Sequence, residues 1–207
     1  MARHRKNPAD QHDRTSTGEQ PTALRVIGGE FRGRKLVYTG DLRTRPMKDR
    51  VREAVFNLVG TEATGKLAID LFAGTGALGF EALSRGAARA VFVEQHFPTA
   101  RVVRQNAALL GATDRCQIDA GNVFLWEPSA KLDADRPWLV FCSPPYAFYV
   151  ERERETLMLI KNLVERAPVG SVFVVESDSR FDNDRLPSSL EWDVRPYPPA
   201  VVAVGRM

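Results

Sequence analysis

The sequence predicts an α/β protein built around one mostly parallel sheet with helices on both faces. Strand-like and helix-like segments alternate from residue 66 onward, which is the order of repeated β-α-β units. Most of the strand-like segments are almost continuously apolar, as strands buried on both faces are. The chain has 207 residues, 43% hydrophobic and 27% charged, which suffices for one such domain and a small appendage.

The first 62 residues precede this alternation. Residues 1–22 are polar, basic and without apolar periodicity, so a disordered tail is expected. Residues 24–27 and 31–38 are expected to pair as a hairpin around Gly28-Gly29. Thr44-Arg45-Pro46-Met47 is expected to open a helix, because proline suits the first helical turn. We therefore divide the chain into a tail (1–22), a hairpin and helix (23–62) and a main domain (63–207).

The main domain contains five apolar segments that we expect to be parallel strands. They lie at residues 67–71, 90–94, 115–119, 138–142 and 169–176, with helices expected at 76–85, 98–110 and 152–166. Two further strands, 191–195 and 200–205, are joined by a proline-rich turn with no helix between them. They are therefore expected to form an antiparallel pair at the sheet edge.

Several classes of protein are disfavoured by composition. No apolar stretch approaches the roughly 20 residues that span a membrane, and the first residues lack the apolar segment of a secretory signal. We expect a cytoplasmic protein. The three histidines show no metal-ligand spacing, and Cys116 and Cys142 belong to no Cys-x-x-Cys pair. Two reduced core thiols and no metal site are expected.

Positive charge is confined to the N-terminal quarter of the chain. Residues 1–53 carry 13 Lys and Arg against 7 Asp and Glu, a net charge of +6. The remaining residues carry 16 against 19, a net charge of −3. A basic block of this kind can neutralise phosphates, so it indicates contact with nucleic acid.

A glycine-rich segment, Asp70-Leu71-Phe72-Ala73-Gly74-Thr75-Gly76-Ala77-Leu78-Gly79, follows the first strand of the main domain. Ligands of doubly wound sheets bind beyond the carboxyl ends of the strands, where glycine lets the backbone approach closely. The glycine spacing alone also fits a dinucleotide. Asp70 favours another ligand, since its carboxylate would repel a pyrophosphate but attract an ammonium group. S-adenosylmethionine carries an ammonium group as well as a positive sulfonium.

Two more acids end the next two strands. Glu94 can accept hydrogen bonds from both hydroxyls of a ribose, and Asp119 can accept one from the amino group of an adenine. Acids at the ends of three adjacent strands favour S-adenosylmethionine over NAD. An NAD-dependent oxidoreductase is the alternative from another class.

A rigid turn, Ser143-Pro144-Pro145-Tyr146, follows the apolar strand 138–142. It suits a planar group that bears an amino nitrogen. Ser143 Oγ and the Pro144 carbonyl can accept hydrogen bonds from such an amine and free its delocalised lone pair, while Tyr146 can stack on the base. If the planar group is a nucleic acid base, it must be unstacked to enter this pocket. S-adenosylmethionine is an activated methyl donor, so positioning of the amine should supply most of the rate of methyl transfer.

The chain resembles the RsmD-type methyltransferases, which modify the N2 amine of one guanine in small-subunit ribosomal RNA. The resemblance runs from about Leu24 to Met207. Its most specific blocks are Arg25-Val26-Ile27-Gly28-Gly29 and Asp49-Arg50-Val51-Arg52-Glu53. The others are Arg32-Gly33-Arg34-Lys35-Leu36, Arg45-Pro46, the glycine-rich segment, Glu81-Ala82-Leu83-Ser84-Arg85-Gly86-Ala87 and the Pro-Pro-Tyr turn.

This resemblance implies a class I S-adenosylmethionine-dependent methyltransferase fold, which is Rossmann-like, with strand order 3-2-1-4-5-7-6 and a small N-terminal hairpin and helix extension. It implies a catalytic turn of Ser143, Pro144 and Tyr146. The implied cofactor contacts are Asp70, Phe72, Gly74, Gly76, Glu94, Asp119 and Ala120. The implied RNA contacts are Arg25, Arg32, Arg34, Lys35, Arg45 and Arg50. The expected partner is 16S rRNA, naked or within an assembling small subunit, and the enzyme is expected to be a monomer.

Position 143 departs from the family pattern, because the family usually has aspartate before Pro-Pro. A hydroxyl is a weaker acceptor than a carboxylate, and Ser-Pro-Pro-Tyr is familiar in enzymes that methylate the N4 amine of cytosine. We expect methyl transfer to guanine N2 of 16S rRNA. The alternatives are another amine target (adenine N6 or cytosine N4 in DNA or RNA, or a protein glutamine) and a catalytically weak RNA-binding homologue.

Overall fold

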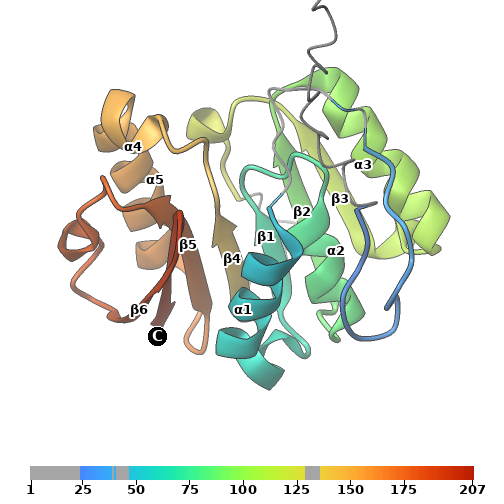
Figure 1. The fold of residues 1–207 in the computed structure, drawn as a ribbon, viewed down its shortest axis with the longest axis horizontal. Coiled ribbons are helices and arrows are strands. Elements are labelled where there is room, and N and C mark those ends of the chain that lie inside the picture. Colours follow the sequence, from blue (N-terminus) through green and yellow to red (C-terminus); the bar gives the residue numbers. More distant parts are fainter. Residues whose placement is uncertain (1–23, 39, 41–46, 129–135) are drawn as a thin grey trace, which may run out of the picture.

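A seven-stranded sheet forms the centre of the molecule, in the order β3-β2-β1-β4-β5-β7-β6 (Figure 1). The computed structural model describes residues 24–38, 40, 47–128 and 136–207. The strands are β1 (Leu67–Asp70), β2 (Arg89–Glu94), β3 (Cys116–Ala120), β4 (Trp138–Cys142), β5 (Val172–Asp178), β6 (Glu191–Tyr197) and β7 (Ala200–Arg206). The first five are parallel, and β7 runs antiparallel to both β5 and β6. The predicted fold class, strand order and antiparallel edge pair are confirmed.

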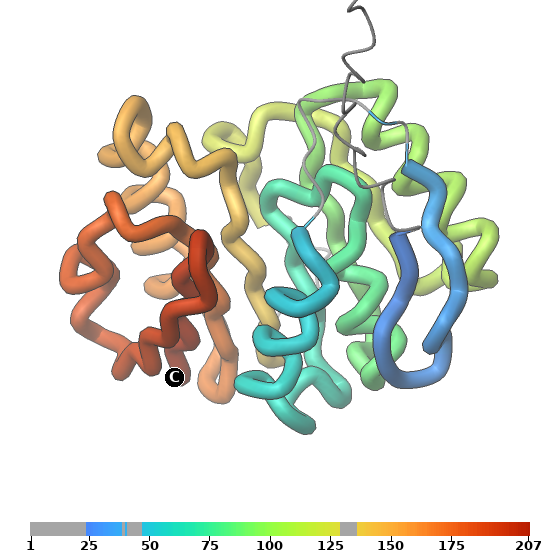
Figure 2. Tube along the Cα trace, viewed as in Figure 1, coloured from blue at the N-terminus to red at the C-terminus, as the bar shows by residue number. Residues whose placement is uncertain are grey.

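Helices cover both faces of the sheet. They are α1 (Asp49–Val59), α2 (Ala77–Ser84), α3 (Phe97–Leu110), α4 (Phe148–Glu151) and α5 (Glu153–Arg166), with short 3₁₀ helices at Gly60–Ala63, Thr113–Arg115, Val123–Leu125 and Asn183–Arg185. Successive strand residues point to opposite faces. Ala68 therefore packs in the core beneath α1, α2 and α3, while Ile69 packs with α5. Figure 2 shows α1 in front of the sheet and α5 behind it.

The N-terminal hairpin differs from its prediction. Its two arms are joined by an isolated bridge between Arg25 and Lys35 and by a few backbone hydrogen bonds, such as Leu36 N to the Leu24 carbonyl at 2.8 Å, and neither arm is a strand. The predicted tight turn at Gly28-Gly29 extends over residues 28–33. The physical reason lies in α2, because the amides of residues 27, 28, 30 and 31 donate to Glu81 and Ser84 instead of to a partner strand.

Gly29 shows why this arm lies so close to α2. Its φ is 75°, and a Cβ there would lie 1.8 Å from the Ser84 carbonyl oxygen. Leu24, Val26, Phe31 and Leu36 of the hairpin are buried in the same core as α1 and α2. The hairpin thus shares its core with the sheet, and the domain boundary near residue 62 stays a prediction.

The predicted disordered tail, residues 1–22, lies wholly outside the described residues, as do Thr44, Arg45 and Pro46 of the predicted helix opening. Within the described part, α1 begins at Asp49 and is followed by Gly60. The short helix α4 directly follows the proline turn and was not predicted. No helix in the described ranges is long and apolar enough to cross a membrane.

Candidate active site

A cavity of about 700 Å³ opens at the carboxyl edge of the central strands. The glycine segment after β1 supplies Gly74, and the turn after β4 supplies the four residues Ser143-Pro144-Pro145-Tyr146. Residues from β2, β5, the start of α1 and the turn between β6 and β7 complete the wall. The two bends that the sequence marks as chemically important therefore face one shared space.

Asp70 is the buried acid of this cavity. It ends β1, lines the cavity and is 2% exposed. Its Oδ2 accepts one hydrogen bond, from Gly79 N at a distance of 3.1 Å. Burial raises the pKa of Asp70 to about 7; the Gly79 hydrogen bond opposes this rise and the nearby Glu94 adds to it. A cation bound here would relieve the cost of burying the carboxylate. The site therefore fits the ammonium group of an amino acid.

Glu94 lines the same cavity from the end of β2. Its carboxylate accepts hydrogen bonds from Gly74 N at 2.8 Å and from His96 N at 2.7 Å. These bonds tie the glycine bend of β1 to the end of β2. Each carboxylate oxygen has a further lone pair for a ligand hydroxyl. Phe72 also lines the cavity, so three of the predicted cofactor contacts besides Gly74 are brought together.

Gly76 does not line the cavity, and its structural reason is packing. Its φ is 78°, and a Cβ there would lie 2.6 Å from Phe80 Cε2. Gly79 is equally constrained, because its Cβ would lie 2.3 Å from Phe92 Cε1. These glycines allow α2 to approach the sheet closely, and the bend at Gly74 lines the cavity.

Asp119 and Ala120 are also absent from the cavity wall. Glu94 pairs in register with Ala120, so Asp119 lies one residue earlier. The Asp119 carboxylate accepts hydrogen bonds from Trp126 Nε1 at 2.8 Å and from Gln117 Nε2 at 3.0 Å. These contacts hold the loop after β3, from which Val123 does line the cavity. Contact of Asp119 with a bound cofactor stays a prediction.

The proline turn after β4 carries polar groups on the other side of the cavity. Ser143 Oγ is buried and forms no hydrogen bond of good geometry. Tyr146 Oη donates to Glu176 Oε1 at 2.7 Å. The turn thus places a buried hydroxyl and an aromatic ring beside the cavity, and their contact with an amine stays a prediction.

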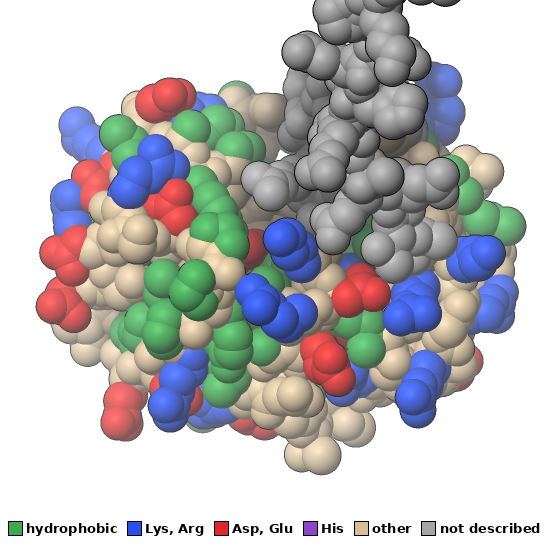
Figure 3. Space-filling model, viewed as in Figure 1, with side chains coloured by type: hydrophobic (Ala, Val, Ile, Leu, Met, Phe, Trp, Pro, Cys, Tyr) green, Lys and Arg blue, Asp and Glu red, His purple; other side chains and the backbone are tan. Residues whose placement is uncertain are grey.

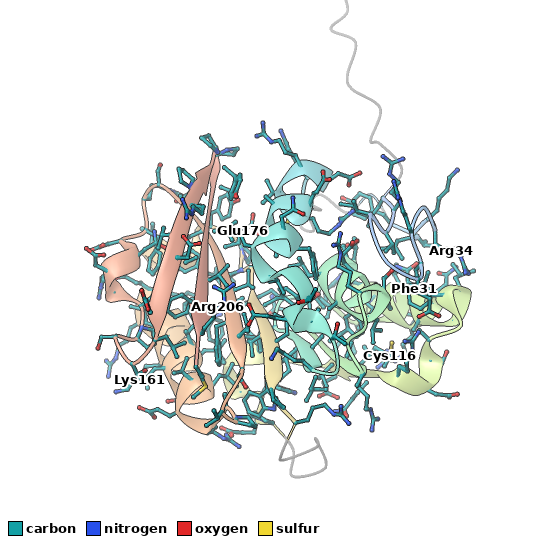
Figure 4. All side chains as sticks on the ribbon, turned by 90° about the horizontal axis from the view of Figure 1, so that it is seen from below. Phe31, Arg34, Cys116, Lys161, Glu176 and Arg206 are labelled. Atoms are coloured by element: carbon teal, nitrogen blue, oxygen red, sulfur yellow. The ribbon has the colours of Figure 1, made fainter. Side chains whose placement is uncertain are left out.

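Glu176 is the site residue that sequence analysis missed. It lies near the end of β5 and is labelled in Figure 4. Its side chain is 9% exposed and lines the cavity. Burial raises the pKa of Glu176, and the hydroxyls of Tyr146 and Ser143 act against that rise. Its position at the end of the predicted strand 169–176 could have indicated this role, because an acid that ends a parallel strand lies at the same edge as Asp70 and Glu94.

The predicted RNA contacts lie elsewhere, on the surface. Arg25, Arg32, Arg34 and Lys35 are exposed on the hairpin, and Figure 3 shows basic side chains over this part of the face. Arg34 donates to the Leu109 carbonyl at the end of α3. Arg50 is exposed and donates to the Pro198 carbonyl at 2.9 Å, next to Pro199 of the cavity wall. Arg45 lies outside the described residues.

A buried ion network attaches the hairpin to the domain. Glu81 of α2, fully buried, accepts from Ile27 N at 2.7 Å, from Gly28 N at 2.8 Å and from Arg85 Nε at 2.8 Å. Arg52 of α1, also fully buried, donates to the Arg25 carbonyl at 2.5 Å and to Asp49 at 3.0 Å. The charged sequence blocks around Arg52 and Glu81 therefore hold the basic hairpin in place.

Comparison with known proteins places the chain in a family. The family model described as "Conserved hypothetical protein 95" matches residues 24–194. YlbH of Bacillus subtilis is 41% identical over 77% of this chain and 85% of its own length. Ribosomal RNA small subunit methyltransferase D of Escherichia coli (strain K12) is 36% identical over 59% of this chain and 60% of its own length.

Solved structures agree on the fold. The yhhF protein of Escherichia coli superposes with a TM-score of 0.71 at 27% identity, over 89% of this chain and 97% of its own. An RNA methyltransferase of Salinibacter ruber, in complex with S-adenosyl-L-homocysteine, has the same fold with a TM-score of 0.57 at 20% identity, over 77% and 92%. The hydride-transfer alternative loses its support. The chain belongs to the RsmD/YlbH family of S-adenosylmethionine-dependent methyltransferases and has the class I methyltransferase fold.

Proposed function

We propose that this protein transfers a methyl group from S-adenosylmethionine to the exocyclic N2 amine of a guanine in 16S rRNA. One observation carries the proposal: a single cavity joins the acids that end β1 and β2 to the proline turn that follows β4. A small-subunit rRNA target is supported by relatives named ribosomal RNA small subunit methyltransferase D.

The β1 and β2 side of the cavity is proposed to hold the cofactor. Asp70 receives its ammonium group, Glu94 its ribose hydroxyls, and Phe72 and Gly74 lie along it; Gly76, Asp119 and Ala120 belong to the same proposed site. Asp70 supports this assignment because it is a buried carboxylate with one hydrogen bond and no cation partner among the described residues. When bound, the cofactor supplies an activated methyl group.

The β4 side is proposed to hold the base. Ser143 Oγ and the Pro144 carbonyl accept N–H bonds from the amine and draw its nitrogen toward tetrahedral geometry. The nitrogen lone pair then forms the new bond to the methyl carbon, the methyl–sulfur bond breaks, and sulfur keeps that electron pair. The amine afterwards loses its extra proton to water. Tyr146 stacks on the ring and holds the nitrogen in line.

The hairpin is proposed to contact the RNA around the target. Arg25, Arg32, Arg34, Lys35, Arg45 and Arg50 supply the positive charge, and the ion network of Arg52 and Glu81 fixes the hairpin beside the sheet. In this proposal the protein acts as a monomer in the cytoplasm, on naked 16S rRNA or on an assembling small subunit.

Mass spectrometry of rRNA from cells that lack the gene tests the proposal. We expect one N2-methylguanine of 16S rRNA to disappear and to return with the wild-type gene. An unchanged guanine pattern, with loss of a methylated adenine or cytosine, would transfer the proposal to that base. Cofactor binding without turnover on any rRNA would favour the catalytically weak RNA-binding homologue.

A further inference from the structure

We propose that the Glu176 carboxylate accepts the N1–H and N2–H groups of the target base and thereby selects guanine. This inference rests on the proposed function and identifies what the cavity recognises. It assigns the recognition of the base to a strand that the sequence motifs do not mark.

Glu176 lines the part of the cavity that is proposed to hold the base. The register of β4 and β5 pairs Cys142 with Val175, so Ser143 and Glu176 are the next residues at the same edge. Both line the cavity, together with Tyr146. Figure 4 places Glu176 in the middle of the molecule, between α1 and the C-terminal strands, whereas Arg34 lies at the far end on the hairpin.

The carboxylate is held in a fixed orientation. Tyr146 Oη donates to Oε1 at 2.7 Å, and Tyr149 Oη donates to the Glu176 carbonyl oxygen at 3.0 Å. Among the described residues no lysine or arginine forms an ion pair with Glu176, although the carboxylate is almost fully buried. A carboxylate has about four acceptor sites, and the hydroxyls of Tyr146 and Ser143 use at most two of them, so two remain for a bound base.

The chemistry of the bases then decides which one fits. The Watson–Crick edge of guanine presents two adjacent donors, N1–H and N2–H, which match the two oxygens of a carboxylate. Adenine and cytosine each present one amine donor beside a ring-nitrogen acceptor, whose lone pair would face the negative oxygen. A polar site of this kind rejects a mismatched partner strongly, because its buried groups are left unpaired. One N2–H thus bonds to Glu176, and Ser143 Oγ and the Pro144 carbonyl share the other.

A nucleotide replacement tests this directly. The substrate is a 16S rRNA transcript that carries guanosine or 2-aminopurine at the methylated position; 2-aminopurine keeps the N2 amine, but its N1 is an acceptor. Wild-type enzyme should lose about tenfold to a hundredfold in kcat/KM on 2-aminopurine. Glu176→Gln, whose amide can donate to an acceptor N1, should be similarly impaired on guanosine and should prefer 2-aminopurine.

Asp178→Asn is the matched control. Asp178 lies on the same strand, pairs with Arg180 and does not line the cavity, so its variant should keep wild-type kcat/KM on both substrates. S-adenosylhomocysteine affinity and thermal unfolding of Glu176→Gln should stay near wild type, which checks that the variant is folded.

Three outcomes would overturn the inference. They are wild-type rates of Glu176→Gln on guanosine, an equal loss of this variant on both substrates, and wild-type enzyme that methylates 2-aminopurine as fast as guanosine. The last needs no variant at all, so a misfolded Glu176→Gln leaves the inference testable. A wild-type enzyme that methylates no guanine would instead count against the proposed function.

Discussion

The two sides of the cavity are organised differently. On the β1 and β2 side, carboxylates bind the main chain: Asp70 accepts from Gly79 N, and Glu94 accepts from Gly74 N and His96 N. On the β4 and β5 side, side chains bind each other: Tyr146 Oη donates to Glu176, and the Ser143 hydroxyl acts on the same carboxylate. The contacts on the β1 and β2 side depend on the path of the backbone. The side-chain contacts on the β4 and β5 side can be changed by single substitutions without altering the fold. A common cofactor and a variable target base would call for this division.

The largest effect is expected from Asp70→Asn, on the β1 and β2 side of the cavity. Loss of the buried charge should weaken S-adenosylmethionine binding about a hundredfold, since hydrogen bonds to charged groups contribute roughly 1.5–3 kcal/mol. The free energy of unfolding should not fall, because the variant removes a costly buried charge. Isothermal titration calorimetry and thermal unfolding measure the two effects. Asp114→Asn, outside the cavity, is the control, and equal affinities of both variants would contradict the role of Asp70.

Cofactor affinity should also depend on pH through the same group. The folded-state pKa of Asp70 is about 7, against 3.8 in the unfolded chain, so binding of a cation should strengthen about tenfold from pH 5.5 to pH 7. The unliganded protein should behave oppositely. It retains a proton that the unfolded chain releases, so its free energy of unfolding should fall as pH rises from about 4 to 7. Both trends should vanish in Asp70→Asn, and their persistence there would assign them to another group.

Ser143→Ala tests the β4 side of the cavity. We expect kcat to fall about tenfold, because the amine then has one acceptor fewer, with cofactor affinity unchanged. Thermal stability should hold, since the hydroxyl forms no hydrogen bond of good geometry in the free protein. Single-turnover methylation and calorimetry separate the two quantities. A loss of cofactor affinity equal to the loss of kcat would show that the two sides are not independent.

The smallest effect is expected at the surface. Replacing Arg32, Arg34 and Lys35 by alanine should weaken RNA binding severalfold and make the salt dependence shallower, by about 0.7–0.9 log units for each phosphate that is no longer neutralised. Filter binding across a salt series measures both. The control replaces three exposed cations of α5, which are Arg154, Lys161 and Arg166. Identical salt slopes for the two triple variants would remove the hairpin from the RNA surface.

Much of the fold was accessible from sequence because it depends on local pattern. Apolar runs such as Trp138–Cys142 are strands, and the pair around Pro196, Pro198 and Pro199 is the antiparallel edge. The hairpin could not be predicted in the same way. Its amides bind Glu81 and Ser84, more than fifty residues away in sequence, and no local propensity reports such a contact.

The site divides in the same manner. Asp70, Gly74, Glu94, Ser143 and Tyr146 were indicated by motifs or strand ends, and the structure gathers them around one cavity. Asp119 also ends a predicted strand, but it does not line the cavity and instead accepts hydrogen bonds from Gln117 and Trp126. Glu94 pairs with Ala120, so Asp119 lies one residue before the position level with Glu94. Glu176 belongs to no motif, and only the pairing of β5 beside β4 brings it to Ser143.

A crystal structure with S-adenosylhomocysteine is the most direct test of the shared cavity. One cavity must hold the amino-acid part of the cofactor at Asp70 while its sulfur faces Ser143 and Tyr146. We predict the ligand ammonium within hydrogen-bond distance of an Asp70 oxygen, with open space between the sulfur and the Glu176 carboxylate that is wide enough for a purine. A ligand whose ammonium lies away from Asp70, or whose sulfur is separated from the proline turn by protein atoms, would contradict the proposed site.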